Sequence, residues 1–162
     1  MIAVMAVDTP YTAKLEGKDP IAAMRETPEQ IRSTAASWSP QQFDRSYAPG
    51  KWTARQILIH LAQSELALGN RARMALSTPN YVAQAFNQDE WLARDGKLSG
   101  KEALDAFLAM AAMNRVMFAG LSAGERQIGL QHPEYGALTV DWILYQLAGH
   151  QIHHLQQLEQ IK

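Results

Sequence analysis

The fold is decided by the C-terminal stretch DWILYQLAGHQIHHLQQL, which runs from Asp141 to Leu158. One set of its residues recurs every three or four positions, which is the spacing of a single face of an α-helix. Because most of this set is apolar, the stripe is expected to face the core and to carry two histidines inward. Its members are Ile143, Leu147, His150, His154, Leu158 and Ile161. A second row is polar and is expected to face solvent; it contains Gln146, Gly149, His153, Gln157 and Gln160.

Two inward histidines four positions apart indicate a metal site. The imidazoles of His150 and His154 lie one helical turn apart, so both can reach one ion. Two neutral rings buried side by side would each need a hydrogen-bond partner, and two charged rings would repel each other. A metal ion relieves both problems because it takes one nitrogen of each ring.

His60 is the third candidate ligand, and it stands in the apolar segment ILIHLA of a second predicted helix. It lies about 10 Å from the start of that helix, and His154 lies about as far from the end of the last helix. If the two helices are antiparallel, the three rings meet at one level. A histidine on an apolar face is more often a hydrogen-bonded core residue than a ligand, so three core histidines are the alternative interpretation.

Helix-capping signals predict three long helices before the last one. A helix start is favoured where Asp or Thr precedes Pro, and where Ser or Thr stands three residues before Gln or Glu. The expected helices cover residues 20–37, in two parts that separate at Thr27-Pro28, then residues 53–76 and residues 99–119. The last helix is expected from Thr139 to the end of the chain.

The remaining segments are expected to be short helices or irregular. Residues 86–94 read as a short helix inside a long middle connection, and residues 120–138 as a loop that leaves His132 at the surface. Residues 1 to about 17 are expected to form an irregular arm over the helices. Since no stretch alternates with a period of two, we predict an all-α fold, a single four-helix bundle with residues 1–162 as one domain.

Composition excludes several classes of function. The 162 residues suit one domain, and 15 Lys+Arg against 16 Asp+Glu give a charge of −1 without a basic stripe, so no nucleic-acid partner is expected. No cysteine is present, which excludes disulfides, iron–sulfur clusters and a thiol nucleophile, and leaves nitrogen and oxygen as metal ligands. No membrane span and no convincing signal peptide are seen, so a cytoplasmic location is expected.

Two motifs resemble the DinB-like (YfiT-like) superfamily of metal-dependent enzymes. They are the segment PGKWTARQILIHL at residues 49–61 and the pair His150-x-x-x-His154 followed by LQQL. The opening GKDPI at residues 17–21 is also similar. The resemblance runs from about residue 10 to the end and is weakest between residues 77 and 135.

The resemblance implies both a fold and an activity. Members of this family form four-helix bundles that bind zinc or nickel through one histidine of the second helix and a histidine pair of the fourth, which fall on His60, His150 and His154. A metal-dependent enzyme acting on a small molecule is implied, either a transferase that uses a low-molecular-weight thiol or a hydrolase. Many members pair as homodimers, for which Met110, Met113 and Met117 are candidate surface residues, although core packing is the simpler reading of them.

No catalytic residue is identified, because no His-Glu-x-x-His motif is present. Gln63 and Ser64 beside His60, and Tyr145 and Gln146 before His150, are candidates for lining a pocket. Glu65 lies about 140° around the helix from His60 and reads as a solvated or inter-helix charge. The alternative is a non-catalytic metal-binding bundle with a stress-response or interaction role. An enzyme should have an open pocket at the metal, whereas this alternative does not require one.

Overall fold

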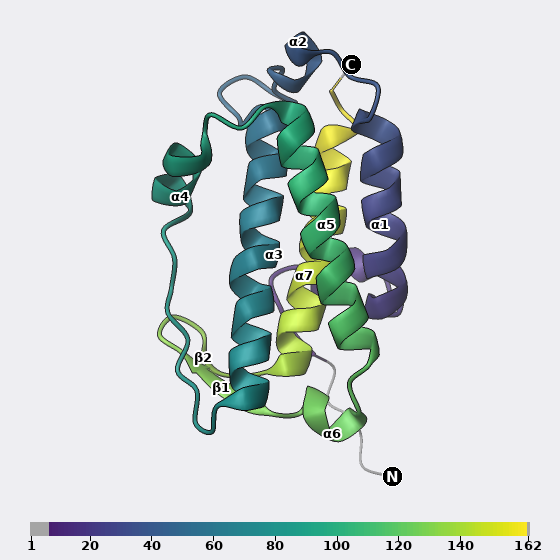
Figure 1. Cartoon of the computed structure of the whole chain (residues 1–162). Helices are drawn as coiled ribbons and strands as arrows, with labels where there is room; N and C mark the ends of the chain where they lie inside the picture. Colours follow the sequence, from purple (N-terminus) through teal and green to yellow (C-terminus); the bar gives the residue numbers. More distant parts are fainter. Residues whose placement is uncertain (1–6, 162) are drawn as a thin grey trace.

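The computed structural model describes residues 7–161, and four long helices dominate it (Figure 1). They are α1 (Pro20–Ala35), α3 (Ala54–Ser77), α5 (Gly100–Ala119) and α7 (Val140–Leu158). Each of these helices packs against two of the others, in the cyclic order α1, α5, α3, α7. The mostly helical fold predicted from the sequence is therefore confirmed.

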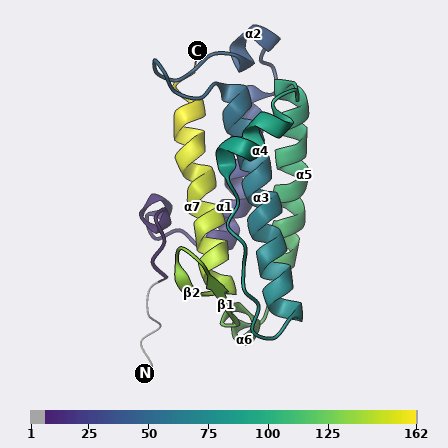
Figure 2. The same ribbon diagram turned by 90° about the vertical axis from the view of Figure 1, so that its left-hand side faces the viewer.

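The helix directions depend on the long middle connection. In Figure 1, α3 and α5 both run downward, whereas α1 and α7 run upward. The chain must therefore return from the lower end of α3 to the upper end before α5 begins. Residues 78–99 make this return along the outside of α3 (Figure 2) and include the helix α4 (Gln88–Asp95). The bounds of α4 differ by only one or two residues from those of the short helix predicted at residues 86–94. Because α3 and α7 are antiparallel, His60 and the α7 histidines can meet at one level.

Capping side chains fix the helix starts. The side chains of Thr53 and Ser99 accept hydrogen bonds from the backbone N–H three residues later, and Gln56 and Glu102 complete both capping boxes. Asp19 caps α1, which begins at Pro20. The break expected at Thr27-Pro28 is wrong, because α1 continues through Pro28. Both residues are buried, and we attribute the continuity to tertiary packing that outweighs the missing N–H donor.

The segment at residues 120–138 is not the loop that the sequence predicts. It contains the short helix α6 (Ala123–Arg126) and nearly all of an antiparallel hairpin. The two strands of this hairpin are β1 (Gly129–His132) and β2 (Gly136–Thr139). The all-α prediction is corrected by this small sheet. Strands of four residues are too short to show a period-two pattern, and Gly136 takes the positive φ of +73° that the turn requires. A parallel bridge between Val82 and Gln131 then joins the middle connection to β1.

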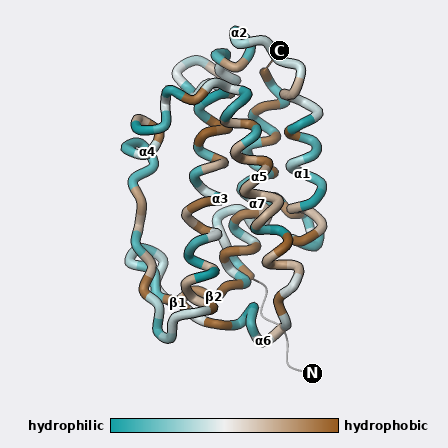
Figure 3. The backbone as a smooth tube through the Cα atoms, viewed as in Figure 1, coloured by the Kyte–Doolittle hydropathy of each residue, from teal (hydrophilic) through white to brown (hydrophobic). Residues whose placement is uncertain are grey.

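The connectors at the upper end also contain regular structure. Ser39 caps the one-turn helix α2 (Pro40–Phe43), which has its own capping box. Apolar segments recur along all four long helices (Figure 3) and form two buried clusters. One cluster contains Ile57 and Leu158, and the other contains Ile143 and Phe118. Along α7, His150 and His154 stand between Ala148 of the second cluster and Leu155 of the first.

The N-terminal arm contains a short 3₁₀ helix, η1 (Thr12–Leu15), which packs on α7 (Figure 2). Residues 1–6 of the expected arm lie outside the described residues. The arm approaches Gly149 so closely that a Cβ atom there would collide with the backbone of Tyr11. The row of α7 expected to face solvent is therefore largely covered: Gly149 is buried, Gln146, His153 and Gln157 are half-buried, and only Gln160 is exposed. Among the helices of residues 7–161, none has the length and apolarity needed to span a membrane.

Candidate metal centre

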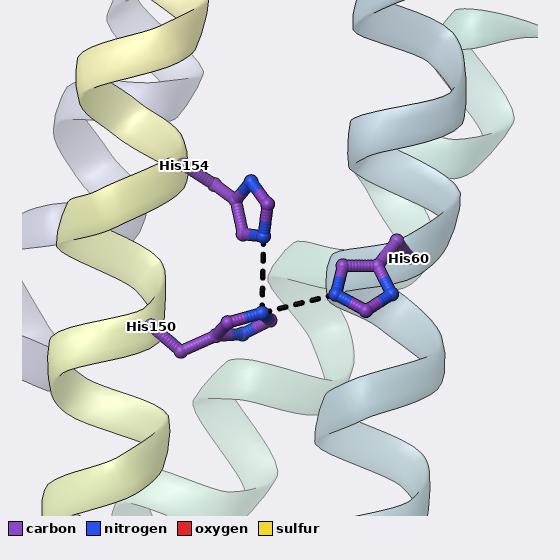
Figure 4. A group of neighbouring side chains, drawn as sticks. All are labelled: His60, His150 and His154. Atoms are coloured by element: carbon purple, nitrogen blue, oxygen red, sulfur yellow. Dashed lines mark hydrogen bonds between the residues drawn. The ribbon is translucent and has the colours of Figure 1, made fainter. Parts of the chain in front are cut away.

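His60 of α3 and His150 and His154 of α7 converge in the interior (Figure 4). Nε2 of His150 lies 3.0 Å from Nε2 of His60 and 3.0 Å from Nε2 of His154. One ring nitrogen from each residue lies within 4.8 Å of the other two. All three side chains are buried, with 5–7% of each residue exposed.

Burial keeps the three rings neutral. Desolvation lowers the pKa of His60 to about 4 and that of His154 to about 3, because a charged ring would lose its hydration. Burial also lowers the pKa of His150 well below its usual value, and the neighbouring His154 and His60 add to this effect. Neutral imidazoles with free lone pairs are the form that binds a metal.

Hydrogen bonding between the rings cannot satisfy the cluster. A neutral imidazole has one N–H donor and one lone pair, so Nε2 of His150 can make only one good hydrogen bond, yet it contacts two other ring nitrogens. Nδ1 of His60 is buried and has no hydrogen-bond partner among residues 7–161. Contacts within the protein therefore leave the three rings partly unsatisfied. Three converging nitrogen donors of this kind fit a divalent metal.

Gln157 sets the tautomer of His154. Its Oε1 lies 2.7 Å from Nδ1 of His154 and can only accept, so the ring proton is on Nδ1 and the lone pair of Nε2 points at the cluster. The Nε2 group of Gln157 donates to the hydroxyl of Tyr47 at 3.1 Å, which holds the amide in this orientation. Such a partner behind a ligating histidine is typical of metal sites.

Aromatic rings cover the cluster on two sides. The ring of Tyr11 lies 5.1 Å from that of His150 and 5.2 Å from that of His153, centroid to centroid. The ring of Trp52 lies 4.9 Å from that of His60. Trp52, which stands just before α3, therefore forms part of the wall around the candidate ligands.

Two cavities reach the cluster. The first, of about 350 Å³, is lined by His60 and His150 and extends along α3 and α7 toward the hairpin. The second, of about 320 Å³, is lined by His60 and His154 and lies on the side of Tyr47 and Trp52. The cluster is therefore buried in the bundle but open to space on both sides.

The four pocket candidates from the sequence separate into two pairs. Ser64 and Gln146 line the first cavity, and Oε1 of Gln146 is buried without a partner among the described residues. Gln63 instead donates to Asp95 of α4 at 2.7 Å, and Tyr145 packs against one of the apolar clusters.

Glu65 is an inter-helix group, and the solvated reading of it is wrong. The residue is 2% exposed, and its carboxyl group accepts hydrogen bonds from Asn114 of α5 and Gln151 of α7. Burial raises the pKa of Glu65 to about 7, although both hydrogen bonds oppose the increase.

Other residues at the site were not identified from the sequence. His132, expected at the surface, is buried and lines the first cavity together with Arg71, Phe86 and Trp142. Its position depends on the hairpin, which no pattern predicted. Gln157 could have been found, because a glutamine three residues after a ligating histidine can reach its ring on a helix.

Known proteins match most of this chain. A sequence model described as the DinB superfamily matches residues 23–158. Two proteins of Oceanobacillus iheyensis, both named "Putative metal-dependent hydrolase", are 27% and 25% identical to the chain over 136 and 133 residues. The first alignment covers 83% of this chain and 79% of the relative, and the second covers 80% and 76%. These matches confirm the resemblance carried by the two sequence motifs.

Two solved structures share the fold. YfiT from Bacillus subtilis, described as having "an unusual four-helix bundle topology", matches with a TM-score of 0.73 at 19% identity and covers 95% of this chain and 86% of its own. A mycothiol-dependent maleylpyruvate isomerase matches with a TM-score of 0.72 at 15% identity, over 86% of this chain and 59% of the isomerase. At such identities the likeness concerns the fold alone.

Proposed function

We propose that this chain, which belongs to the DinB superfamily, is a metal-dependent enzyme acting on a small molecule. His60, His150 and His154 hold the ion, which is zinc or nickel. The proposal takes residues 1–162 as one domain and includes the cytoplasmic location expected from the sequence.

The observation that carries this proposal is the opening of the histidine cluster into a cavity. Three protein ligands leave at least one coordination position free, which is typical of catalytic rather than structural sites. The first cavity is lined by two of the three histidines and has the volume of a small-molecule site. A metal that only stabilised the bundle would not need this space, so the cavity favours the enzyme over the non-catalytic alternative.

The chain's own residues prepare the site. Zinc or nickel would supply Lewis acidity, which activates a thiol or a water for attack. Gln157 holds the lone pair of His154 toward the cluster, and burial keeps all three imidazoles unprotonated at neutral pH. Tyr11 and Trp52 limit access of bulk water to the rings. Ser64 and Gln146 present polar atoms to a molecule in the first cavity.

Thiol transfer is placed ahead of hydrolysis in this proposal. A transfer reaction needs room for two reactants, and two cavities with different linings adjoin the ligands. A protein of the same fold is named as a mycothiol-dependent isomerase. The names of the Oceanobacillus relatives favour hydrolysis instead, which is kept as the second candidate.

A homodimer remains an expectation. Met113 and Val116 are exposed on α5, whereas Met110 and Met117 pack against the apolar clusters. Of the three methionines considered for a dimer surface, only Met113 is exposed, and Val116 is exposed next to it.

Cobalt substitution tests the reaction class. Protein loaded with Co²⁺ should develop a thiolate-to-cobalt absorption band with N-acetylcysteine and none with N-acetylserine, which differs only in its hydroxyl. His154→Ala should abolish the band. If N-acetylcysteine has no effect while the zinc-loaded protein cleaves 4-nitrophenyl acetate and the zinc-free protein does not, thiol transfer is contradicted and hydrolysis takes its place.

A further inference from the structure

The first cavity has a second polar end, away from the histidine cluster. One wall follows α3 through His60, Ser64, Leu68 and Arg71, and the facing wall follows α7 back from His150 to Trp142. Because α3 and α7 are antiparallel, both walls lead from the ligands toward the hairpin. Arg71 stands eleven positions after His60, about 16 Å further along the helix axis. The Arg71 side chain is expected to lean back toward the N-terminus of α3, as helical side chains do.

Arg71 brings a positive charge to this end, and the carboxylate of Glu134 is near enough to interact with it electrostatically. One of its N–H groups donates to the carbonyl oxygen of Gln84 at 2.7 Å, and the guanidinium carbon lies 5.8 Å from the ring centroid of Phe86. Within residues 7–161 no carboxylate forms an ion pair with it. A guanidinium has five N–H donors, so most of them remain available to a ligand.

His132 supplies a second donor beside it. Its Nδ1 accepts the backbone N–H of Glu134 at 3.1 Å and that of Tyr135 at 3.3 Å, so the proton of the neutral ring is on Nε2. Burial and the nearby Arg71 lower the pKa of His132, which favours this neutral form. Among the described residues, the ring of His132 forms hydrogen bonds through Nδ1 alone. Because His132 lines the cavity, its Nε2 N–H is available to donate to a molecule bound there.

We propose that Arg71 and His132 bind a carboxylate group of the substrate, while the reacting part of the same molecule lies at the histidine cluster. This inference rests on the proposed function and narrows the substrate class to small organic acids. The rings of Phe86, which lies against Arg71, and of Trp142 also line this cavity and suit an apolar or aromatic body. The unpartnered amide of Gln146 can pair with a polar group near the middle.

The charge balance favours a carboxylate over a phosphate. The planar guanidinium matches the two oxygens of a carboxylate, and His132 adds a neutral donor. A phosphate would bring close to two negative charges against one positive charge. Glu134, exposed on the rim of the same cavity, already offsets part of the charge of Arg71, so it opposes a dianion more strongly than a singly charged carboxylate.

Matched probes test this site without knowledge of the substrate. Phenylacetate, phenylacetamide and phenyl phosphate have similar aromatic bodies and differ in the group offered to Arg71. Binding of each is followed by NMR titration of ¹⁵N-labelled protein, both metal-free and zinc-loaded. Phenylacetate should bind both forms and shift the amide signals of His132, Glu134 and Tyr135, and phenylacetamide should bind at least about tenfold more weakly.

Variants assign the binding to Arg71. Arg71→Gln should weaken phenylacetate at least about tenfold, Arg71→Lys should weaken it less, and Arg25→Gln, which removes an exposed arginine of α1, should leave it unchanged. Zinc content should be the same in all three variants.

Three results would overturn the inference: tighter binding of phenyl phosphate, equal binding of the amide, or phenylacetate binding that needs zinc and ignores Arg71→Gln. The last result would mean that the carboxylate binds the metal, which would leave the proposed metal site intact. Carboxylate binding at Arg71 in a protein that takes up no metal would support the recognition site and contradict the proposed function.

Discussion

Nδ1 of His154 and Oε1 of Gln157 lie 2.7 Å apart across one turn of α7. The contact determines which nitrogen of His154 faces His60 and His150. Gln157 is itself held by the hydroxyl of Tyr47, which stands in the connector before α3. The orientation of one candidate ligand therefore depends on a residue more than a hundred positions away in the chain.

Gln157→Ala should weaken metal binding by about 10- to 100-fold without unfolding the bundle, because the ring of His154 loses the group that fixes its tautomer. Competition with a chromophoric zinc chelator measures the affinity. Gln160→Ala, an exposed glutamine one turn further along the chain, is the control and should bind metal like the parent. An unchanged affinity in Gln157→Ala would show that the hydrogen bond does not orient the ligand.

Gly149→Ala should displace the N-terminal arm, because the added methyl group would occupy the position of the Tyr11 backbone. We expect a loss of about 1–3 kcal/mol in unfolding free energy and faster proteolytic cleavage near η1. Urea denaturation and limited trypsin digestion measure the two effects. Gly124→Ala is the matched control, because a Cβ atom there meets nothing within 4 Å. Equal cleavage of the two variants would mean that the arm is not held at Gly149.

Glu65→Gln should change how stability depends on pH. The folded protein holds the carboxyl proton of Glu65 up to a pKa of about 7, whereas an ordinary glutamate loses it near 4.5. Between these values the folded state binds more protons, so this group lowers the unfolding free energy as pH rises, by about 1.4 kcal/mol per pH unit at most. Buried histidines act in the opposite direction below their usual pKa, so the comparison must be made between variants.

From pH 4.5 to 7, the Glu65→Gln variant should therefore become more stable relative to the parent. Above pH 7 the difference between their unfolding free energies should stay constant. Urea denaturation of the metal-free proteins at several pH values measures it. Glu29→Gln, at an exposed position of α1, should show no such trend. A constant difference for Glu65→Gln would mean that this carboxyl group titrates normally.

The stripe on α7 shows how much of the site the sequence predicted. Ile143, Leu147, His150, His154 and Leu158 are all buried, as their spacing requires. The estimate that His60 and His154 stand at similar heights in antiparallel helices also agrees with the observed cluster. Both inferences concern a single helix or a helix pair, for which period and rise suffice.

Contacts from distant segments account for what the sequence did not reveal. Nothing in α7 itself indicates that the arm covers Gly149, because that contact belongs equally to Tyr11. His132 looked exposed because it precedes a proline in a glycine-containing segment, yet the hairpin turns it inward. Glu65 is buried because Asn114 and Gln151 bring it hydrogen bonds from two other helices. Helical periodicity cannot predict such cross-helix partners.

The most direct test of the account is elemental analysis of untagged protein purified without chelators, beside the His150→Ala/His154→Ala double variant. We expect close to one zinc or nickel ion per chain in the parent and none in the variant, with the helical content of both preserved by circular dichroism. A parent that contains neither metal and takes up neither when it is added would contradict the metal centre. His60, His150 and His154 would then be core residues, and the proposed enzymatic function would be contradicted as well.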